Sequence, residues 1–220
     1  MVTLAMMFGD GYTNDAIAPF VKFLESHGIK TIGIPLLEEE ENTSYSDITP
    51  ENYCKYIDSF IPRFCNDLCL YGISKGCEWL MIYASRRSNV KKLILVEPTT
   101  FPGKPEYLVE FEKDRGNDYV EDYYQNEGVD EQQDNAKMTL DAIASDRHHY
   151  YPKCPINIVW TARNNQNEAY SPQVIQMKHQ YVNYLRSHGC KVRVFEKNSD
   201  HCIDTHEQHF PFLLRVITEV

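Results

Sequence analysis

One stretch, from Asp67 to Leu80, constrains the fold more than any other part of the chain. The apolar run 68–71 is typical of a buried strand, and it leads directly into the five residues Gly72-Ile-Ser-Lys-Gly76. Apolar residues then recur at helical spacing, at Cys77, Leu80, Met81 and Ala84. The sequence therefore predicts a strand, a sharp turn and a helix, with Ser74 at the turn.

The Gly-x-Ser-x-Gly spacing has a physical reason in this context. A serine on a strained turn at a strand end exposes its hydroxyl, and the residues two positions to either side meet where strand and helix converge. Only very small side chains fit there, and Gly72 and Gly76 supply them. The helix then points its N-terminal N–H groups at the Ser74 hydroxyl, where negative charge would develop. Because so short a pattern also arises by chance, the rest of the chain must support a catalytic interpretation.

Strand-like and helix-like segments alternate along most of the chain. Six apolar segments are typical of strands: 2–8, 30–35, 68–71, 90–97, 155–161 and 191–196. Segments with a helical apolar face lie between most of these strands. Thr49-Pro50 indicates the start of one helix, and Pro19 is expected near the first turn of another. The segment 209–218 is expected to form a closing helix. This alternation predicts an α/β fold with a mainly parallel six-stranded sheet and helices on both faces.

The segment 99–153 breaks the alternation. It contains no clear strand, it carries 13 of the 32 Asp and Glu residues, and it holds six tyrosines. We therefore expect one domain over 1–220, with 99–153 as an inserted helical cap or lid.

Charge and cysteine usage narrow the class of protein. A formal net charge of −10 argues against nucleic acids and anionic membranes as partners. The seven cysteines are scattered, with no metal-ligand spacing, which is typical of a reducing compartment. No signal peptide and no apolar run long enough to span a membrane is visible, so we expect a soluble, cytoplasmic protein. The sequence says nothing of its oligomeric state.

With these features, nearly the whole chain resembles the α/β-hydrolase superfamily. Gly72-Ile-Ser-Lys-Gly76 matches the family's nucleophile elbow, and Phe8-Gly9 matches its oxyanion loop. The insertion lies where lids of the family usually lie, and Asp200-His201 follows the last strand, where the family keeps its catalytic histidine. The resemblance implies a serine esterase or thioesterase that needs no metal and no cofactor.

The resemblance assigns Ser74 as nucleophile and His201 as the base that takes its proton. His206 competes with His201, and His148 and His149 lie in the expected cap. The position directly after the last strand favours His201.

The acid that orients the histidine is open, since the usual aspartate after the seventh family strand is missing. That position falls on or beside Asn164, and an asparagine could orient the histidine as in Cys-His-Asn proteases, with weaker electrostatic support. Glu97, at the end of the sixth family strand, ranks close to Asn164, because some lipases of the superfamily carry their acid there. Glu168, further along the chain, ranks behind both. Without an effective acid, the domain would only bind its ligand.

The remaining site residues concern the oxyanion and the substrate. The resemblance implies that the Lys75 N–H donates one hydrogen bond to the oxyanion. It implies that a second donor comes from the loop of Gly9, Asp10, Gly11 and Tyr12. The Tyr12 ring could line the acyl pocket. The expected substrate is a small carboxylic ester or thioester. A binding protein on the same fold and a small peptidase are the alternatives. Phe8-Gly-Asp-Gly-Tyr12 lacks the glycine spacing of a dinucleotide-binding loop.

Overall fold

The fold is seen in a computed structural model that describes residues 2–9, 12, 14–37, 49–63, 65, 67–98, 151–163, 169–170 and 172–219. The side chains of residues 14, 173, 174 and 177 lie outside this description. All but the last three residues of the expected cap, 99–153, also lie outside it, so the cap stays a prediction.

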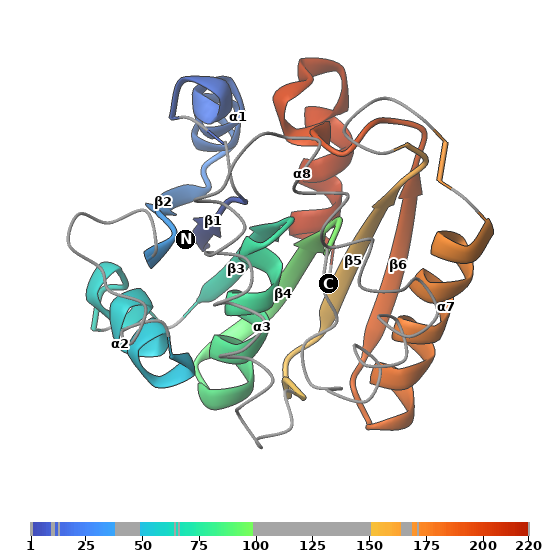
Figure 1. Ribbon diagram of the computed structural model, residues 1–220. Coiled ribbons are helices and arrows are strands. Elements are labelled where there is room, and N and C mark those ends of the chain that lie inside the picture. Colours follow the sequence, from blue (N-terminus) through green and yellow to red (C-terminus); the bar gives the residue numbers. More distant parts are fainter. Residues whose placement is uncertain are drawn as a thin grey trace, which may run out of the picture.

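A single sheet of six parallel strands forms the centre of the molecule (Figure 1). Its strand order is β2-β1-β3-β4-β5-β6. The strands are β1 (Thr3–Met7), β2 (Lys30–Ile34), β3 (Leu68–Ile73), β4 (Val90–Val96), β5 (Ile156–Thr161) and β6 (Val192–Lys197). The predicted α/β fold class is confirmed, and every pairing among the described strands is parallel.

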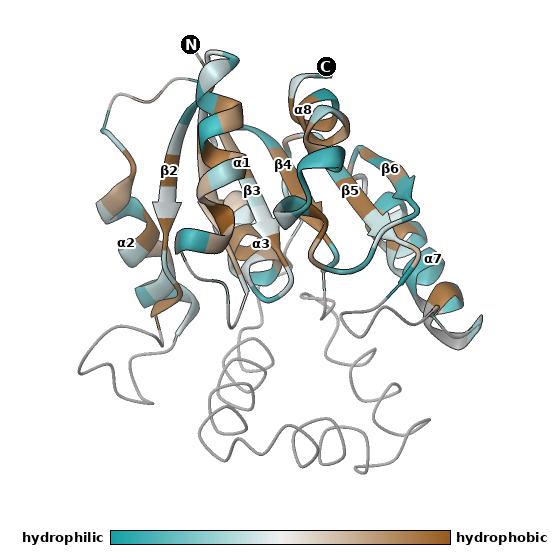
Figure 2. Cartoon of the chain, turned by 90° about the horizontal axis from the view of Figure 1, so that it is seen from above, coloured by the Kyte–Doolittle hydropathy of each residue, from teal (hydrophilic) through white to brown (hydrophobic). Residues whose placement is uncertain are grey.

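Helices cover both faces of the sheet (Figure 2). The side chains of successive strand residues pack into two separate hydrophobic cores, one on each face. The helices are α1 (Asn14–Ser26), α2 (Pro50–Phe60), α3 (Gly76–Arg86), α7 (Pro172–Ser187) and α8 (Phe210–Thr218), with short 3-10 turns η3 (Ile203–Thr205) and η4 (Glu207–His209) before α8. Ala5 and Met7 point to the core under α2, α3 and α7, whereas Leu4 and Met6 point to the core under α1 and α8. Within the described ranges, no helix combines the length and the apolarity that a membrane crossing needs.

The start of α2 agrees with the sequence prediction, whereas the start of α1 does not. The Thr49 side chain accepts a hydrogen bond of 3.2 Å from the Asn52 N–H, as an N-cap should. Pro19, however, lies inside α1 rather than in its first turn. The apolar stripe begins at Ile17, but the helix already begins at Asn14, so the stripe alone placed the helix start too late.

The glycines of the Gly-x-Ser-x-Gly segment are required by close backbone contacts. A Cβ on Gly76 would lie 2.3 Å from the Met7 carbonyl oxygen of β1, and a Cβ on Gly72 would lie 2.8 Å from Cys77 Cα. Both contacts are shorter than van der Waals distances. They are also to backbone atoms, which cannot rotate away as a side chain can.

We expect Gly76→Ala to lower the free energy of unfolding by about 2 kcal/mol or more, because α3 must move away from β1 to admit the methyl group. Chemical denaturation measures the difference. Gly33→Ala is the matched control, since a Cβ on Gly33 of β2 meets nothing within 4 Å. Equal denaturation midpoints for the two variants would contradict the packing described for Gly76.

Candidate active site

The sharp turn between β3 and α3 holds Ser74 in a strained conformation. Ser74 has a φ of 52°, and Glu97 has a φ of 49°; the described residues include no other non-glycine residue with a positive φ. Such backbone costs energy and concentrates at functional sites. The Ser74 N–H donates to the Val96 carbonyl at 3.0 Å, so the two strained residues lie at the carboxyl ends of adjacent strands, β3 and β4.

Gly9 packs directly against the Ser74 side chain. A Cβ on Gly9 would lie 2.6 Å from Ser74 Cβ, 3.0 Å from Ser74 Oγ and 3.3 Å from the Lys75 nitrogen. The loop after β1 therefore faces both the hydroxyl and the first N–H of the following turn. This is the place that an oxyanion loop occupies relative to a nucleophile.

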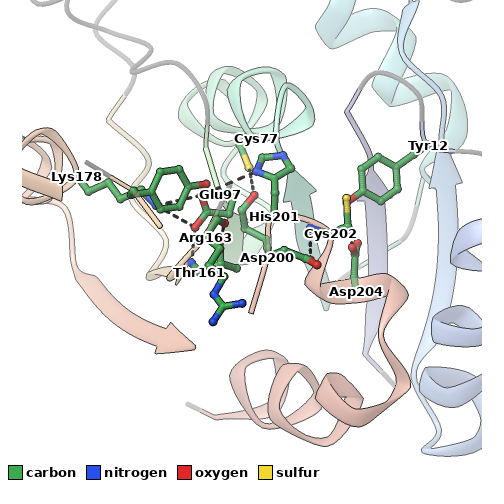
Figure 3. Close-up of polar contacts among 12 residues, drawn as sticks. Tyr12, Cys77, Glu97, Thr161, Arg163, Lys178, Asp200, His201, Cys202 and Asp204 are labelled. Carbon is green, nitrogen blue, oxygen red and sulfur yellow. Dashed lines mark hydrogen bonds and ion pairs between the residues drawn. The ribbon is translucent and has the colours of Figure 1, made fainter. Parts of the chain in front are cut away.

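Glu97 is a buried carboxylate at the end of β4, with only 3% of its surface exposed. The Lys178 Nζ atom from α7 lies 3.1 Å from each carboxylate oxygen. The Tyr170 hydroxyl donates to Oε2 at 2.7 Å, and the Thr161 N–H donates to Oε1. Figure 3 shows this network between α7 and the end of the sheet. The carboxylate is thus held from several sides.

His201 is placed beside the same carboxylate (Figure 3). Its Nδ1 atom lies 3.9 Å from Glu97 Oε2, which is an ion-pair distance rather than a hydrogen bond. The competing His206 pairs instead with Asp200, its Nε2 atom lying 3.0 Å from each carboxylate oxygen. Within the described residues, no hydrogen bond joins Ser74 to His201. This is compatible with a catalytic pair, because catalytic hydrogen bonds are often long in structures without substrate.

The electrostatics of Glu97 favour its ionised form. Burial alone would raise the pKa of the Glu97 carboxyl, but His201, Lys178, Thr161 and Tyr170 outweigh burial and bring that pKa below its ordinary value. Burial lowers the pKa of the Lys178 ammonium, against the attraction of Glu97. Because a carboxylate lies in contact with it, we assign Lys178 as the cation of the pair.

Tyr12 contacts the segment that follows His201. Its hydroxyl donates to Asp204 Oδ1 at 3.2 Å, and its ring stacks on Phe8 with 5.5 Å between centroids. Asp204 is completely buried, and this burial raises the pKa of its carboxyl to about 7. The contact joins the loop after β1 to the segment that carries His201. Tyr12 therefore has a structural contact that the sequence did not predict, and its proposed pocket role stays a prediction.

Several candidates lie outside the described residues, namely Asp10, Gly11, Asn164 and Glu168. Their proposed roles therefore stay predictions. Of the three candidates for the acid, only Glu97 belongs to the described residues, and it lies near His201. Lys75 is buried, directly after Ser74. The described residues contain no cluster of three or more His, Cys, Asp or Glu side chains arranged for a metal ion.

Sequence reasoning missed Lys178 and Tyr170. One signal was available for Lys178: it lies on the helical stripe that also includes Val174, Tyr181 and Leu185, where an apolar residue is expected. A lysine in such a position needs a buried partner, because an unpaired charge there is costly. The partner, Glu97, is distant in sequence and could not be identified from the pattern.

Comparison with known proteins supports the fold. No protein-family model and no curated protein sequence matches the chain. Among solved structures, MGS-MChE2, an α/β-hydrolase enzyme from a sediment metagenome of the Mar Chica lagoon in Morocco, matches with a TM-score of 0.63 and 16% identity over 97% of this chain and 89% of its own.

Two further structures match over similar lengths. A Bacillus megaterium epoxide hydrolase has a TM-score of 0.62 and 13% identity over 100% of this chain and 94% of its own. The thioesterase domain from the curacin biosynthetic pathway has a TM-score of 0.60 and 15% identity, covering 98% of this chain and 90% of its own. Together with the parallel sheet and the Ser74 turn, these similarities show that the chain has the α/β-hydrolase fold.

Proposed function

We propose that the protein is a serine hydrolase that cleaves a carboxylic ester or thioester through an acyl-enzyme on Ser74. One observation carries the proposal: the strained Ser74 turn lies against Gly9 and next to the strand end whose Glu97 faces His201. A hydroxyl, a base and an acid on neighbouring loops at one sheet edge are the parts that acyl transfer needs.

Each side chain has a distinct role in this mechanism. His201 Nε2 takes the hydroxyl proton as Ser74 Oγ attacks the acyl carbon, and Nδ1 faces Glu97 Oε2 at 3.9 Å, which stabilises the imidazolium. The Lys75 N–H and a donor from the Gly9–Tyr12 loop bind the oxyanion. The protonated His201 then gives its proton to the departing alcohol or thiol. Water, activated by the same imidazole, releases the acid and restores the Ser74 hydroxyl.

The similar structures support a hydrolase in general terms, since they include a thioesterase domain, an α/β-hydrolase enzyme and an epoxide hydrolase. The serine at the turn supports acyl transfer to water. The ester or thioester bond is our own inference from this chemistry.

A second candidate function is a binding protein on the same fold. The observation in its favour is that His201 does not hydrogen-bond to Glu97, whose oxygens accept from Lys178, Tyr170 and Thr161 instead. In that case the network would be structural and Ser74 would have ordinary serine reactivity.

Hydrolysis of a graded panel tests the proposal. We would measure release of p-nitrophenol from p-nitrophenyl esters of two to twelve carbons, release of thiol from matching acyl-N-acetylcysteamine thioesters, and release of p-nitroaniline from amino-acid p-nitroanilides. We expect turnover of an ester or a thioester with saturation kinetics. Turnover of the anilides alone would favour a peptidase, and no turnover by folded protein would favour the binding protein.

We expect Gly9→Ala to lower kcat/KM by about 100-fold, because the added methyl group would displace the Ser74 side chain from its reactive position. The substrate that the panel identifies serves for the measurement, and circular dichroism verifies the fold. Gly33→Ala again serves as control and should keep its activity. Unchanged kinetics in Gly9→Ala would argue against a reacting hydroxyl at this place.

A further inference from the structure

The ion pair between Lys178 and Glu97 is unusual for its place in the molecule. Only 11% of the Lys178 side chain and 4% of the Glu97 side chain are exposed. The Lys178 ammonium also lies 3.6 Å from the Tyr170 ring centroid and 4.6 Å from that of Trp160. Burying two charges costs free energy, so a pair built this tightly beside a candidate active site calls for a reason beyond stability.

We propose that Lys178 is a positioning residue of the Ser74 site: it holds the Glu97 carboxylate toward His201, and its charge sets the pH at which the Glu97–His201 pair takes up the proton. The inference rests on the proposed function. Lys178 touches neither the serine nor the substrate in this scheme, and it acts through Glu97 alone.

The contacts of Glu97 support the first half of the proposal, that Lys178 holds the carboxylate toward His201. An ionised carboxylate offers about four acceptor directions. Here Lys178 occupies one direction on each oxygen, Tyr170 a second on Oε2 and Thr161 a second on Oε1. The Nζ atom is equally far from the two oxygens, so a small shift toward Oε1 leaves Oε2 free to accept the His201 Nδ1–H. Lys178 can therefore hold the carboxylate while His201 closes on it.

The charges around Glu97 support the second half of the proposal, that Lys178 sets the pH at which the Glu97–His201 pair takes up the proton. A cation next to Glu97 disfavours a second positive charge on the neighbouring imidazole and on the pair as a whole. Among the described residues, Glu196 of β6 lies beside Lys178, and Cys77 of α3 and the Tyr170 hydroxyl lie beside Glu97. The buried Asp204 carboxyl faces His201. None of these groups carries a positive charge, and Lys178 is the cation in contact with Glu97.

The expected sign follows from proton binding. When Lys178 is replaced by a neutral residue, the Glu97–His201 pair loses a nearby positive charge and binds its shared proton more tightly, whichever group holds it. The acid limb of the pH profile of kcat/KM should then move to higher pH, by about one unit. A residue that only supports the fold would lower the rate at every pH without moving this limb.

Four variants separate these effects. Lys178→Met removes the charge and keeps side-chain volume between the two rings. This volume matters because Lys178 lines a cavity of about 340 Å³, which alanine would enlarge. Lys178→Gln is neutral but can still donate to Glu97, and it serves if the methionine variant does not fold. Lys178→Arg keeps the charge. Lys197→Met removes an equal charge from β6, where the lysine lies over the Phe212 ring.

The experiment combines the pH profile of ester or thioester hydrolysis with an NMR titration of the histidine ring nitrogens, in which His201→Ala assigns the His201 signals. We expect both midpoints to move up in Lys178→Met and Lys178→Gln, and to stay in Lys178→Arg and Lys197→Met. Unmoved midpoints in both neutral variants, with hydrolysis intact, would overturn the proposal for Lys178. Moved NMR midpoints in a protein that hydrolyses nothing would instead overturn the proposed function and leave the electrostatic coupling standing.

Discussion

Replacing Ser74 with alanine is expected to lower kcat about a million-fold, to near the background rate of the substrate. In the proposed mechanism the hydroxyl oxygen is the atom that bonds to the acyl carbon, and in serine hydrolases removing it costs about as much as removing the whole catalytic group. The variant should fold normally, because serine and alanine meet the same strain at the φ of 52°. Steady-state kinetics at saturating substrate, with highly purified protein, measures the loss.

Ser85→Ala is the matched control for this variant. Ser85 lies in α3, eleven residues along the chain; it is half-buried, and its hydroxyl donates to the Ile82 carbonyl of its own helix. We expect its kcat to stay within about twofold of the wild type, because the substitution removes one local hydrogen bond away from the candidate site. Comparable residual activity in Ser74→Ala and Ser85→Ala would mean that the hydrolysis comes from elsewhere in the molecule or from a contaminant.

The second large effect is expected for Glu97→Gln, which should lower kcat by about a thousand-fold or more. Glutamine keeps the shape of the side chain but cannot stabilise an imidazolium on His201 by charge. In triads of this kind, the amide in place of the acid also lets the histidine adopt the wrong tautomer. The kinetics should be compared with those of Asp200→Asn, which alters the carboxylate that pairs with His206 instead.

The same substitution should change stability in a pH-dependent way. Glu97→Gln leaves the buried Lys178 without its counter-ion, which we expect to cost about 3 kcal/mol at neutral pH. Because the folded pKa of Glu97 lies below its ordinary value, its ionised form stabilises the fold above pH of about 4.3, and this stabilisation is lost as the pH falls through the folded pKa. The difference between wild type and variant should therefore narrow in acid.

Two results would count against this assignment of the acid. Asp200→Asn could prove as damaging as Glu97→Gln, which would favour the His206–Asp200 pair as the working dyad. Alternatively, Glu97→Gln could keep full activity in a folded protein. The acid would then have to be sought at Asn164 or Glu168, outside the described residues.

The part of the site around Ser74 could be predicted from sequence because its determinants are local. A buried strand, two glycines at fixed spacing and the first turn of a helix determine this geometry within ten residues of chain. The parallel sheet was equally predictable, since strand and helix patterns alternate along the chain. The start of α1 was misplaced because its apolar stripe begins at Ile17, whereas the helix already begins at Asn14.

The sequence could not separate the candidates for the acid because their separation depends on distances between loops. Glu97 and Asn164 both follow strands whose carboxyl ends meet at one edge of the sheet. Only the folded chain shows that Glu97 lies 3.9 Å from His201 and in contact with Lys178, 81 residues later. The pairing of Tyr12 with Asp204 is likewise a contact between distant segments, 192 residues apart.

Labelling with a fluorophosphonate, read by intact-protein mass spectrometry, tests the central claim that Ser74 is an activated nucleophile. The probe forms a covalent bond only with a serine whose proton is taken by a neighbouring base. We predict one adduct on the wild type and on His206→Ala, and none on Ser74→Ala or His201→Ala at the same exposure. An unlabelled, well-folded wild type, or an adduct that persists in Ser74→Ala, would contradict the account.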